Sequence, residues 1–281
     1  MATYRFTGAT SGVLSVAGNW SPAGPPVNGD TAIFDNVSVD VTAGLVATAL
    51  AKLYATPRFT GKWGASGAPI EGVGVTNLIW EASSEEVWFG SAAIVRAKIA
   101  PRSVGANAVN FVGSSLGHMR CVTGQINIGA TCTMGALLVL QPSPEGAFIG
   151  PEVIVTSGAT WSTGQRAIVH GGRLQLYCGP TGALTDDFVQ VAGGEIWMRA
   201  GTIDNVYVSG GTFRHDAGTV TAATLTEGRW DATRGAEART LTTLYQLGGE
   251  SDFRNSAAEG KPGTFVYLGG ETSLPEDSYA I

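Results

Sequence analysis

The chain has 281 residues and a formal net charge of −6, and charged residues make up only 14% of it. This balance excludes the basic footprint of a nucleic-acid-binding domain. Together with 44% apolar residues, it also excludes a disordered chain, which combines low hydrophobicity with high charge. Because free-standing domains carry more charge for solubility, the low charge predicts that other subunits cover part of the surface.

The chain opens with Met-Ala-Thr-Tyr-Arg-Phe-Thr-Gly, which lacks the charged and apolar segments of a secretory signal peptide. The longest apolar runs, such as residues 135–140, are too short to cross a bilayer. We therefore expect a protein that either stays in the cytoplasm where it is made or leaves it by a route that needs no signal, such as assembly into a particle released by lysis, and that has no membrane partner.

Residues 1–60 are predicted to form a capping or docking segment. Residues 11–36 are rich in Gly, Pro, Asn and Asp, and a stack of strands needs such a segment to cover its first open edge. The best helical candidate in the chain is residues 44–54, where apolar residues recur at helical spacing over about three turns.

Residues 61–150 are predicted to form an irregular β region. Short strand-like runs, such as residues 76–80 and 87–89, alternate with loops that contain Gly and Pro. No repeat of fixed length is resolved in this part, so its strand layout stays open.

A repeat of small-residue turns organises residues 151–281. The turns are Ser157-Gly158, Gly171-Gly172, Gly193-Gly194, Gly210-Gly211, Glu227-Gly228, Gly248-Gly249 and Gly269-Gly270. They follow one another at similar intervals, and alternating apolar and polar runs flank them. A unit of about 20 residues with two or three short strands is typical of one coil of a β-solenoid.

Stacked coils explain this repeat in physical terms. One coil cannot bury its apolar side alone, but successive coils pair their backbones and share a continuous inner column. Glycine suits the corners, where φ is positive or neighbouring chains approach closely. We therefore predict an all-β fold, a right-handed parallel β-helix or β-solenoid with an N-terminal cap. An antiparallel β-sandwich or meander, in which the Gly pairs are hairpin turns, is the alternative.

Two phrases near the N-terminus carry a family resemblance. They are Gly18-Asn19-Trp20-Ser21-Pro22 and Pro26-Val27-Asn28-Gly29-Asp30-Thr31-Ala32-Ile33-Phe34-Asp35. This string resembles the opening of the first coils in autotransporter-like passenger domains, which are β-helical. The chain departs from autotransporters because it shows neither a signal peptide nor a C-terminal barrel strand. A short β-helical chain of low charge is more similar to virion proteins of tailed bacteriophages.

The resemblance to virion proteins implies a structural, non-enzymatic role. Our first expectation is a capsid decoration (cement) protein that stabilises the phage head by contacts with the major capsid protein or other virion proteins. Such a protein would be located in the virion and would be a homo-oligomer, for which a trimer is the common arrangement. The alternative is a tailspike or tail fibre protein that binds or cleaves host polysaccharide, and a secreted adhesin is disfavoured by the absent signal.

Polysaccharide cleavage, which is common among β-helical proteins, needs two carboxylates that face one groove. Asp186-Asp187 is the one adjacent Asp pair, but neighbours in a strand point to opposite faces. Pectin-cleaving hydrolases of this fold carry Asn-Thr-Asp, Asp-Asp and Gly-His-Gly phrases. Here the first is absent, and Gly117-His118 is followed by Met119 and precedes the Asp pair. We interpret Asp186-Asp187 as a solvated turn.

Other reactive residues are scattered. Glu85-Glu86 reads as a polar turn, and His215-Asp216 lacks the Gly-x-Ser-x-Gly elbow of a hydrolase. His118 and His170 lie far from it in sequence, Asp204-Asn205 and Asp252 do not form a calcium loop, and no phosphate loop is present.

The three cysteines are predicted to be small buried hydrophobic residues, since they are widely spaced and form no zinc pattern; they are Cys121, Cys132 and Cys178. We predict no catalytic, cofactor-binding or metal-binding residue and no cofactor.

The tryptophans offer a different kind of site. An exposed aromatic row would bind sugars by stacking, and the candidates are Trp63, Trp80, Trp88, Trp161, Trp197 and Trp230. We favour the interpretation that Trp197 and Trp230 point inward or into an interface, because large aromatic residues dominate cores and contacts.

Overall fold

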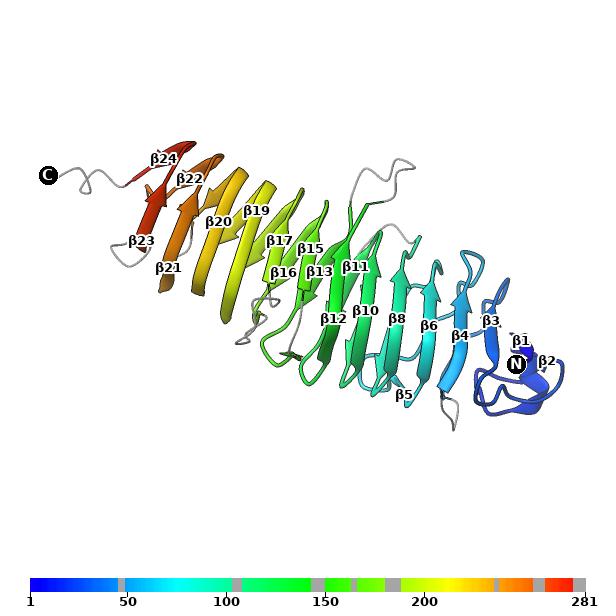
Figure 1. Cartoon of the computed structure of the whole chain (residues 1–281). Coiled ribbons are helices and arrows are strands. Elements are labelled where there is room, and N and C mark those ends of the chain that lie inside the picture. Colours follow the sequence, from blue (N-terminus) through cyan, green and yellow to red (C-terminus); the bar gives the residue numbers. More distant parts are fainter. Residues whose placement is uncertain are drawn as a thin grey trace, which may run out of the picture.

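The strands form one elongated stack, with the N-terminus at one end and strand β24 at the other (Figure 1). The computed structural model describes residues 1–44, 49–102, 108–142, 150–162, 166–179, 188–234, 238–254 and 261–274. The helix described within these ranges is the short 3-10 turn η1 (Ala17–Asn19), so no described helix is long and apolar enough to cross a membrane.

One parallel ladder, here called face A, runs the length of the stack. Its strands, in order of pairing, are β1 (Thr3–Phe6), β3 (Thr31–Phe34), β4 (Ala49–Ala55), β6 (Gly74–Trp80), β8 (Ala93–Ile99), β10 (Ser115–Cys121), β12 (Thr133–Leu140), β15 (Arg166–Val169), β17 (Phe188–Val191), the first halves of β19 (Thr202–His215) and β20 (Gly218–Asp231), β21 (Arg239–Gln246) and β23 (Pro262–Tyr267).

A second parallel ladder, face B, completes each coil. Its strands are β5 (Ile70–Glu71), β7 (Val87–Gly90), β9 (Ala108–Val112), β11 (Gln125–Ile128), β13 (Glu152–Val155), β16 (Arg173–Leu176), β18 (Glu195–Met198), the second halves of β19 and β20, β22 (Glu250–Asp252) and β24 (Glu271–Ser273). The short strand β14 (Thr160–Trp161) adds to β12 of face A.

This pairing confirms the β-solenoid, and the antiparallel alternative is wrong. Gly171-Gly172 connects β15 to β16, as a hairpin turn would, but these two strands do not pair with each other. Instead β15 pairs in parallel with β17, and β16 pairs in parallel with β18, each one coil further on. The Gly pair is therefore a corner between faces A and B.

The helical candidate at residues 44–54 is not a helix where the structure describes it, because Ala49–Ala55 is strand β4; residues 45–48 lie outside the described part. Leu50 and Leu53 are both fully buried, while Ala51 and Lys52 between them point outward. The strand thus bends after the inward-facing Leu50, so that two successive residues point outward before the inward-facing Leu53. This kink creates the spacing of three residues that resembles a helix.

The same kink recurs along face A. Its paired inward residues are Val75 and Leu78, Ile94 and Ala97, Leu116 and Met119, Ile203 and Val206, Val220 and Ala223, and Leu241 and Leu244. Where the kink packs most tightly, the outward position is glycine, because a Cβ on Gly117 would collide with the carbonyl oxygen of Val95. Stacking the kinks keeps the coils in register.

The interior is an aromatic column in the first half of the stack. Phe34 contacts Phe59 and Trp63 at ring-centroid distances of 5.5 and 5.1 Å, and Trp63 contacts Trp80 at 5.4 Å. The column ends with Phe111, and the aliphatic Ile128 follows it in register on the next coil. Large rings that meet edge to face fill the wide first coils efficiently.

The phrase around Asn19 and Asp30 closes the first end of the stack. Strand β2 (Trp20–Ser21) pairs antiparallel with β1, and the Trp20 ring covers Phe6 at 5.2 Å. The buried Asn19 side chain accepts hydrogen bonds from two backbone N–H groups, those of Thr10 (2.8 Å) and Ser11 (2.9 Å), and donates to the Val13 carbonyl. Asp30 accepts from the backbone N–H groups of residues 2 and 27, and these bonds hold its pKa below the usual value.

Strand pairing continues through both predicted segment boundaries. The pair β4–β6 spans residue 60, and the pair β11–β13 spans residue 150. The middle part, whose strand layout the sequence left open, contributes coils like the others. The division into cap, middle region and coils by role stays a prediction.

Candidate functional site

The interior changes character in the last coils. Along one inner column of face A the residues in register are Val208, Leu225, Gln246 and Tyr267, so an aliphatic column ends in polar groups. The Gln246 side chain is fully buried and accepts hydrogen bonds from the hydroxyls of Ser251 (2.7 Å) and Thr272 (2.9 Å). A satisfied polar network is tolerated in a core, and this one marks the end of the apolar column.

Large apolar side chains are exposed at this end. Phe265 and Tyr267 of β23 are in register with the inward residues Leu244 and Gln246, yet they are 36% and 52% exposed. Leu268, just after β23, is 73% exposed. Among the large apolar residues that the structure describes, only Met1 is more exposed. The exposed set in the last coils is Tyr245, Leu247, Phe265, Tyr267 and Leu268. Apolar residues gathered in this way typically mark an interaction surface.

The last strands also present backbone edges. In the part of the chain that the structure describes, β23 pairs with β21 alone and β24 pairs with β22 alone. Strand β23 carries no charged side chain, although charges are the usual protection of an exposed edge. The N-terminal end differs, because β2 and the Trp20 ring cover it.

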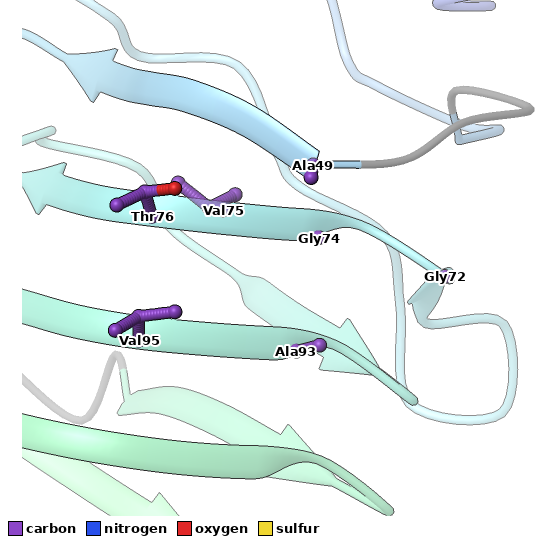
Figure 2. Close-up of a pocket in the computed structure, with 7 residues that line it drawn as sticks. All are labelled: Ala49, Gly72, Gly74, Val75, Thr76, Ala93 and Val95. Carbon is purple, nitrogen blue, oxygen red and sulfur yellow. The ribbon is translucent and has the colours of Figure 1, made fainter. Parts of the chain in front are cut away.

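A shallow hollow lies on face A at the start of β4, β6 and β8 (Figure 2). It has a volume of about 400 Å³ and is open to solvent. Its walls are small or apolar residues, namely Ala49, Gly72, Gly74, Val75, Thr76, Ala93 and Val95. No acidic or basic side chain is among these residues, so the hollow can accept an apolar group but supplies no acid or base.

Trp197 lies at the centre of a cationic cluster on the outer side of face B. The guanidinium carbons of Arg173, Arg199 and Arg214 lie 4.0, 4.7 and 4.6 Å from the centroid of its ring. Asp216 forms ion pairs with Arg199 (2.8 Å) and Arg214 (2.6 Å). Because cations are attracted to the face of an aromatic ring, the cluster ties three coils together. The singly placed arginines give no hint of it in the sequence.

The tryptophans divide between interior and surface. Trp63, Trp80 and Trp230 are fully buried, and Trp230 stacks on Phe213 at 4.5 Å. Trp230 is therefore inward, as expected, whereas Trp197 is outward among the arginines. No row of exposed tryptophans forms in the described residues.

His215 and Asp216 do not form a catalytic dyad. His215 points into the core with no exposed surface, and its Nε2 lies 3.1 Å from the Gly218 carbonyl. Burial lowers the pKa of this imidazole from 6.5 to about 4. Asp216 points the other way, toward Arg199 and Arg214. The histidine is neutral at pH 7 and inaccessible to a substrate in this state.

The remaining sequence candidates also stay apart. His118 is exposed on β10, and His170 is exposed after β15, two coils away along face A. Glu86 accepts hydrogen bonds from the Ser66 N–H and the Trp88 indole, so it holds a turn in place. Asp186-Asp187 lies outside the described residues.

The cysteines behave as packing residues. Cys121 and Cys132 are buried, Cys178 is half-buried, and all three are free thiols. Burial raises the pKa of each thiol above its usual value, which disfavours the reactive thiolate. Within the described ranges, no group of three His, Cys, Asp or Glu residues is placed to hold a metal ion.

The molecule belongs to the structural class of β-solenoids. One of its ends is covered, and the end at the last described coil presents apolar side chains and strand edges. No family model, no curated protein and no solved structure matches the chain.

Proposed function

We propose that this chain is a structural protein of a tailed bacteriophage particle, a head decoration protein that binds the shell through its last coils. The observation that carries the proposal is the set of exposed apolar residues on β21 and β23 and in the turns that follow them. Such a surface is stabilised when a partner covers it. The partner would be the major capsid protein or another virion protein.

The strand edges of β23 and β24 support the same role. An extended segment of a partner can add to such an edge through main-chain hydrogen bonds. The uncharged β23 lets this happen without burying a charge, which is costly at an interface. Low overall charge, 14% of residues, is consistent with a protein that is covered by neighbours in its working state.

Rebinding to depleted particles tests the proposal. Leu247 and Leu268 occupy equivalent places after β21 and β23, and both side chains are exposed, so a Leu247→Ser, Leu268→Ser double variant should fold normally. We expect it to rebind at least about tenfold more weakly than the wild type, because exposed apolar anchors dominate such contacts. Binding is measured by cosedimentation, and shell integrity by release of the packaged nucleic acid on heating.

Val27→Ser is the control, because Val27 is also exposed but lies in the N-terminal cap; it should rebind like the wild type. Normal rebinding of the double variant would contradict the docking surface. Depleted particles that keep their shells and lose only adsorption to cells would contradict the decoration role and favour a tail protein.

A further inference from the structure

A long stretch of the chain contains no acidic residue. Between Val87 and Pro144 there is no Asp or Glu, whereas Arg96, Lys98, Arg102 and Arg120 are all cationic. This occurs in a protein whose formal net charge is −6. The coils built from this stretch therefore carry positive charge against the trend of the whole molecule.

The strand register places cations together on the outer side of face A. Arg96 of β8 is opposite His118 of β10, and Lys98 is opposite Arg120. All four side chains are exposed. Neighbouring strands lie about 4.8 Å apart, and alternate residues on one strand about 7 Å apart, so the four groups form a compact patch, here called the basic patch.

Most of the charge in the basic patch is not neutralised. Lys98 forms an ion pair with Glu81 at 2.6 Å. Among the described residues, no carboxylate lies within ion-pair distance of Arg96 or Arg120. Like charges directly opposite each other on paired strands destabilise a sheet. The fold would therefore be at least as stable without the positive charge of Arg120.

Small polar and apolar groups surround the basic patch. The open hollow is lined by Val75 and Val95 (Figure 2), and Arg96 directly follows Val95 on β8. On the neighbouring strand Asn77 is exposed, and one of its amide N–H groups donates to the Ala51 carbonyl. Its amide oxygen accepts no hydrogen bond from the described residues, so it is available as an acceptor. Guanidinium groups, an amide, an imidazole and an apolar hollow lie side by side.

We propose that the basic patch binds an acidic polysaccharide, a chain of sugars that carry carboxylates. Arg96 and Arg120 would each bind a carboxylate, since arginine pairs with carboxylates in a bidentate manner. Asn77 and His118 would bond to hydroxyl groups, and the hollow would accept the apolar side of a sugar ring. This binding goes beyond the docking role and does not rest on it, because the last coils are left free.

Other polyanions fit the basic patch less well. Duplex DNA is held by proteins that make about 6–10 phosphate contacts, and the patch offers fewer cations, one of which already pairs with Glu81. The patch also contains no Phe, Tyr or Trp ring, the large platforms on which bases of a single strand stack. An acidic protein surface would not need the acceptor and hydroxyl-binding groups around Asn77.

Binding of the isolated full-length protein to defined polymers tests this proposal. The probes are polygalacturonate, neutral dextran, poly-glutamate and a duplex DNA, compared by calorimetry at one ionic strength. We expect polygalacturonate to bind tightest and dextran not to bind. The double variant Arg96→Gln, Arg120→Gln should lose at least about tenfold in affinity, since two charge-assisted contacts are removed.

Arg234→Gln, Lys261→Gln is the matched control, because it removes the same charge from exposed or half-buried positions in later coils; its affinity should stay within about twofold. Equal losses in both double variants, or tighter binding of DNA or poly-glutamate, would overturn the proposal. Urea unfolding gives a second readout. The Arg96→Gln, Arg120→Gln variant should be as stable as the wild type or more stable, and a clear loss of stability would mean that the arginines serve the fold instead.

Discussion

His215 is an ionisable side chain that the fold holds in an apolar interior, in edge-to-face contact with Trp230. Burial lowers its pKa to about 4 from 6.5, so the unfolded chain takes up a proton at a higher pH than the folded chain does. The stability that depends on this group is therefore complete above pH 6.5 and is lost as the pH falls toward 4.

We expect this group to remove about 3 kcal/mol from the free energy of unfolding between pH 7 and pH 4. In His215→Phe the ring remains but the titration does not, so the pH dependence should be smaller by that amount, although the bond to Gly218 is lost at every pH. Urea unfolding at several pH values gives the comparison. Parallel curves for wild type and variant would show that His215 does not titrate as described.

Asn19 is another buried polar residue with a specific structural role. Asn19→Ala leaves the N–H groups of Thr10 and Ser11 without their acceptor, which we expect to cost about 2–4 kcal/mol. Hydrogen exchange should accelerate in the cap and stay unchanged in β21 and β22. Asn28→Ala, an exposed residue with one bond to Ala49, should change stability by less than about 1 kcal/mol. A similar cost for both substitutions would count against the cap as a unit.

At the scale of the element, the Gly corners depend on close approach between coils as well as on positive φ. Gly228 has φ +76°, and a Cβ there would lie 2.5 Å from the Gly211 carbonyl oxygen; Gly29 has φ +81°, but open space around it. Gly29→Ala should cost about 1 kcal/mol for the left-handed backbone. Gly228→Ala should cost about 3 kcal/mol or more, because the coils must also separate. Thermal unfolding measures both, and equal losses would show that stacking does not constrain the corner.

The sequence predicts these corners, but its pattern at strand β4 resembles that of a helix. The Gly pairs and their spacing indicate a coil of about 20 residues, and the parallel pairing of β15 with β17 bears this out. Residues 49–55 fit a helical pattern because a kinked strand and a helix both place apolar residues three apart, as Leu50 and Leu53 are. The kink is visible only when β4 is aligned with β6, since both strands bend at the same place.

The candidate surfaces are less predictable. Phe265 and Leu244 are apolar residues in register on neighbouring strands of face A, yet one is exposed and the other is buried. What separates them is the number of coils stacked above each, which no local pattern encodes. The basic patch depends in the same way on register, because Arg96 and Arg120 are distant in sequence and meet only across β8 and β10.

For the molecule as a whole, the two ends of the stack have opposite properties. At the first end an antiparallel strand, a buried tryptophan and a buried asparagine close the interior. At the other end the strands of the last described coil present their edges and their aromatic side chains. Docking through the last described coil, as we propose, would fix the orientation of the stack on its partner and leave its long sides, including the basic patch, accessible.

Two successive coils of equal length in the second half of the stack have a further consequence. Val189, Val206 and Ala223 are in register and evenly spaced in the sequence, and a Gly corner recurs with them. Residues 206–222 therefore make up one coil. Loss or duplication of this block would move the open end by one strand spacing, about 4.8 Å, and leave the neighbouring coils unchanged. The number of coils between β10 and β23 therefore sets the distance from the basic patch to the last described coil, and to any partner that would dock there.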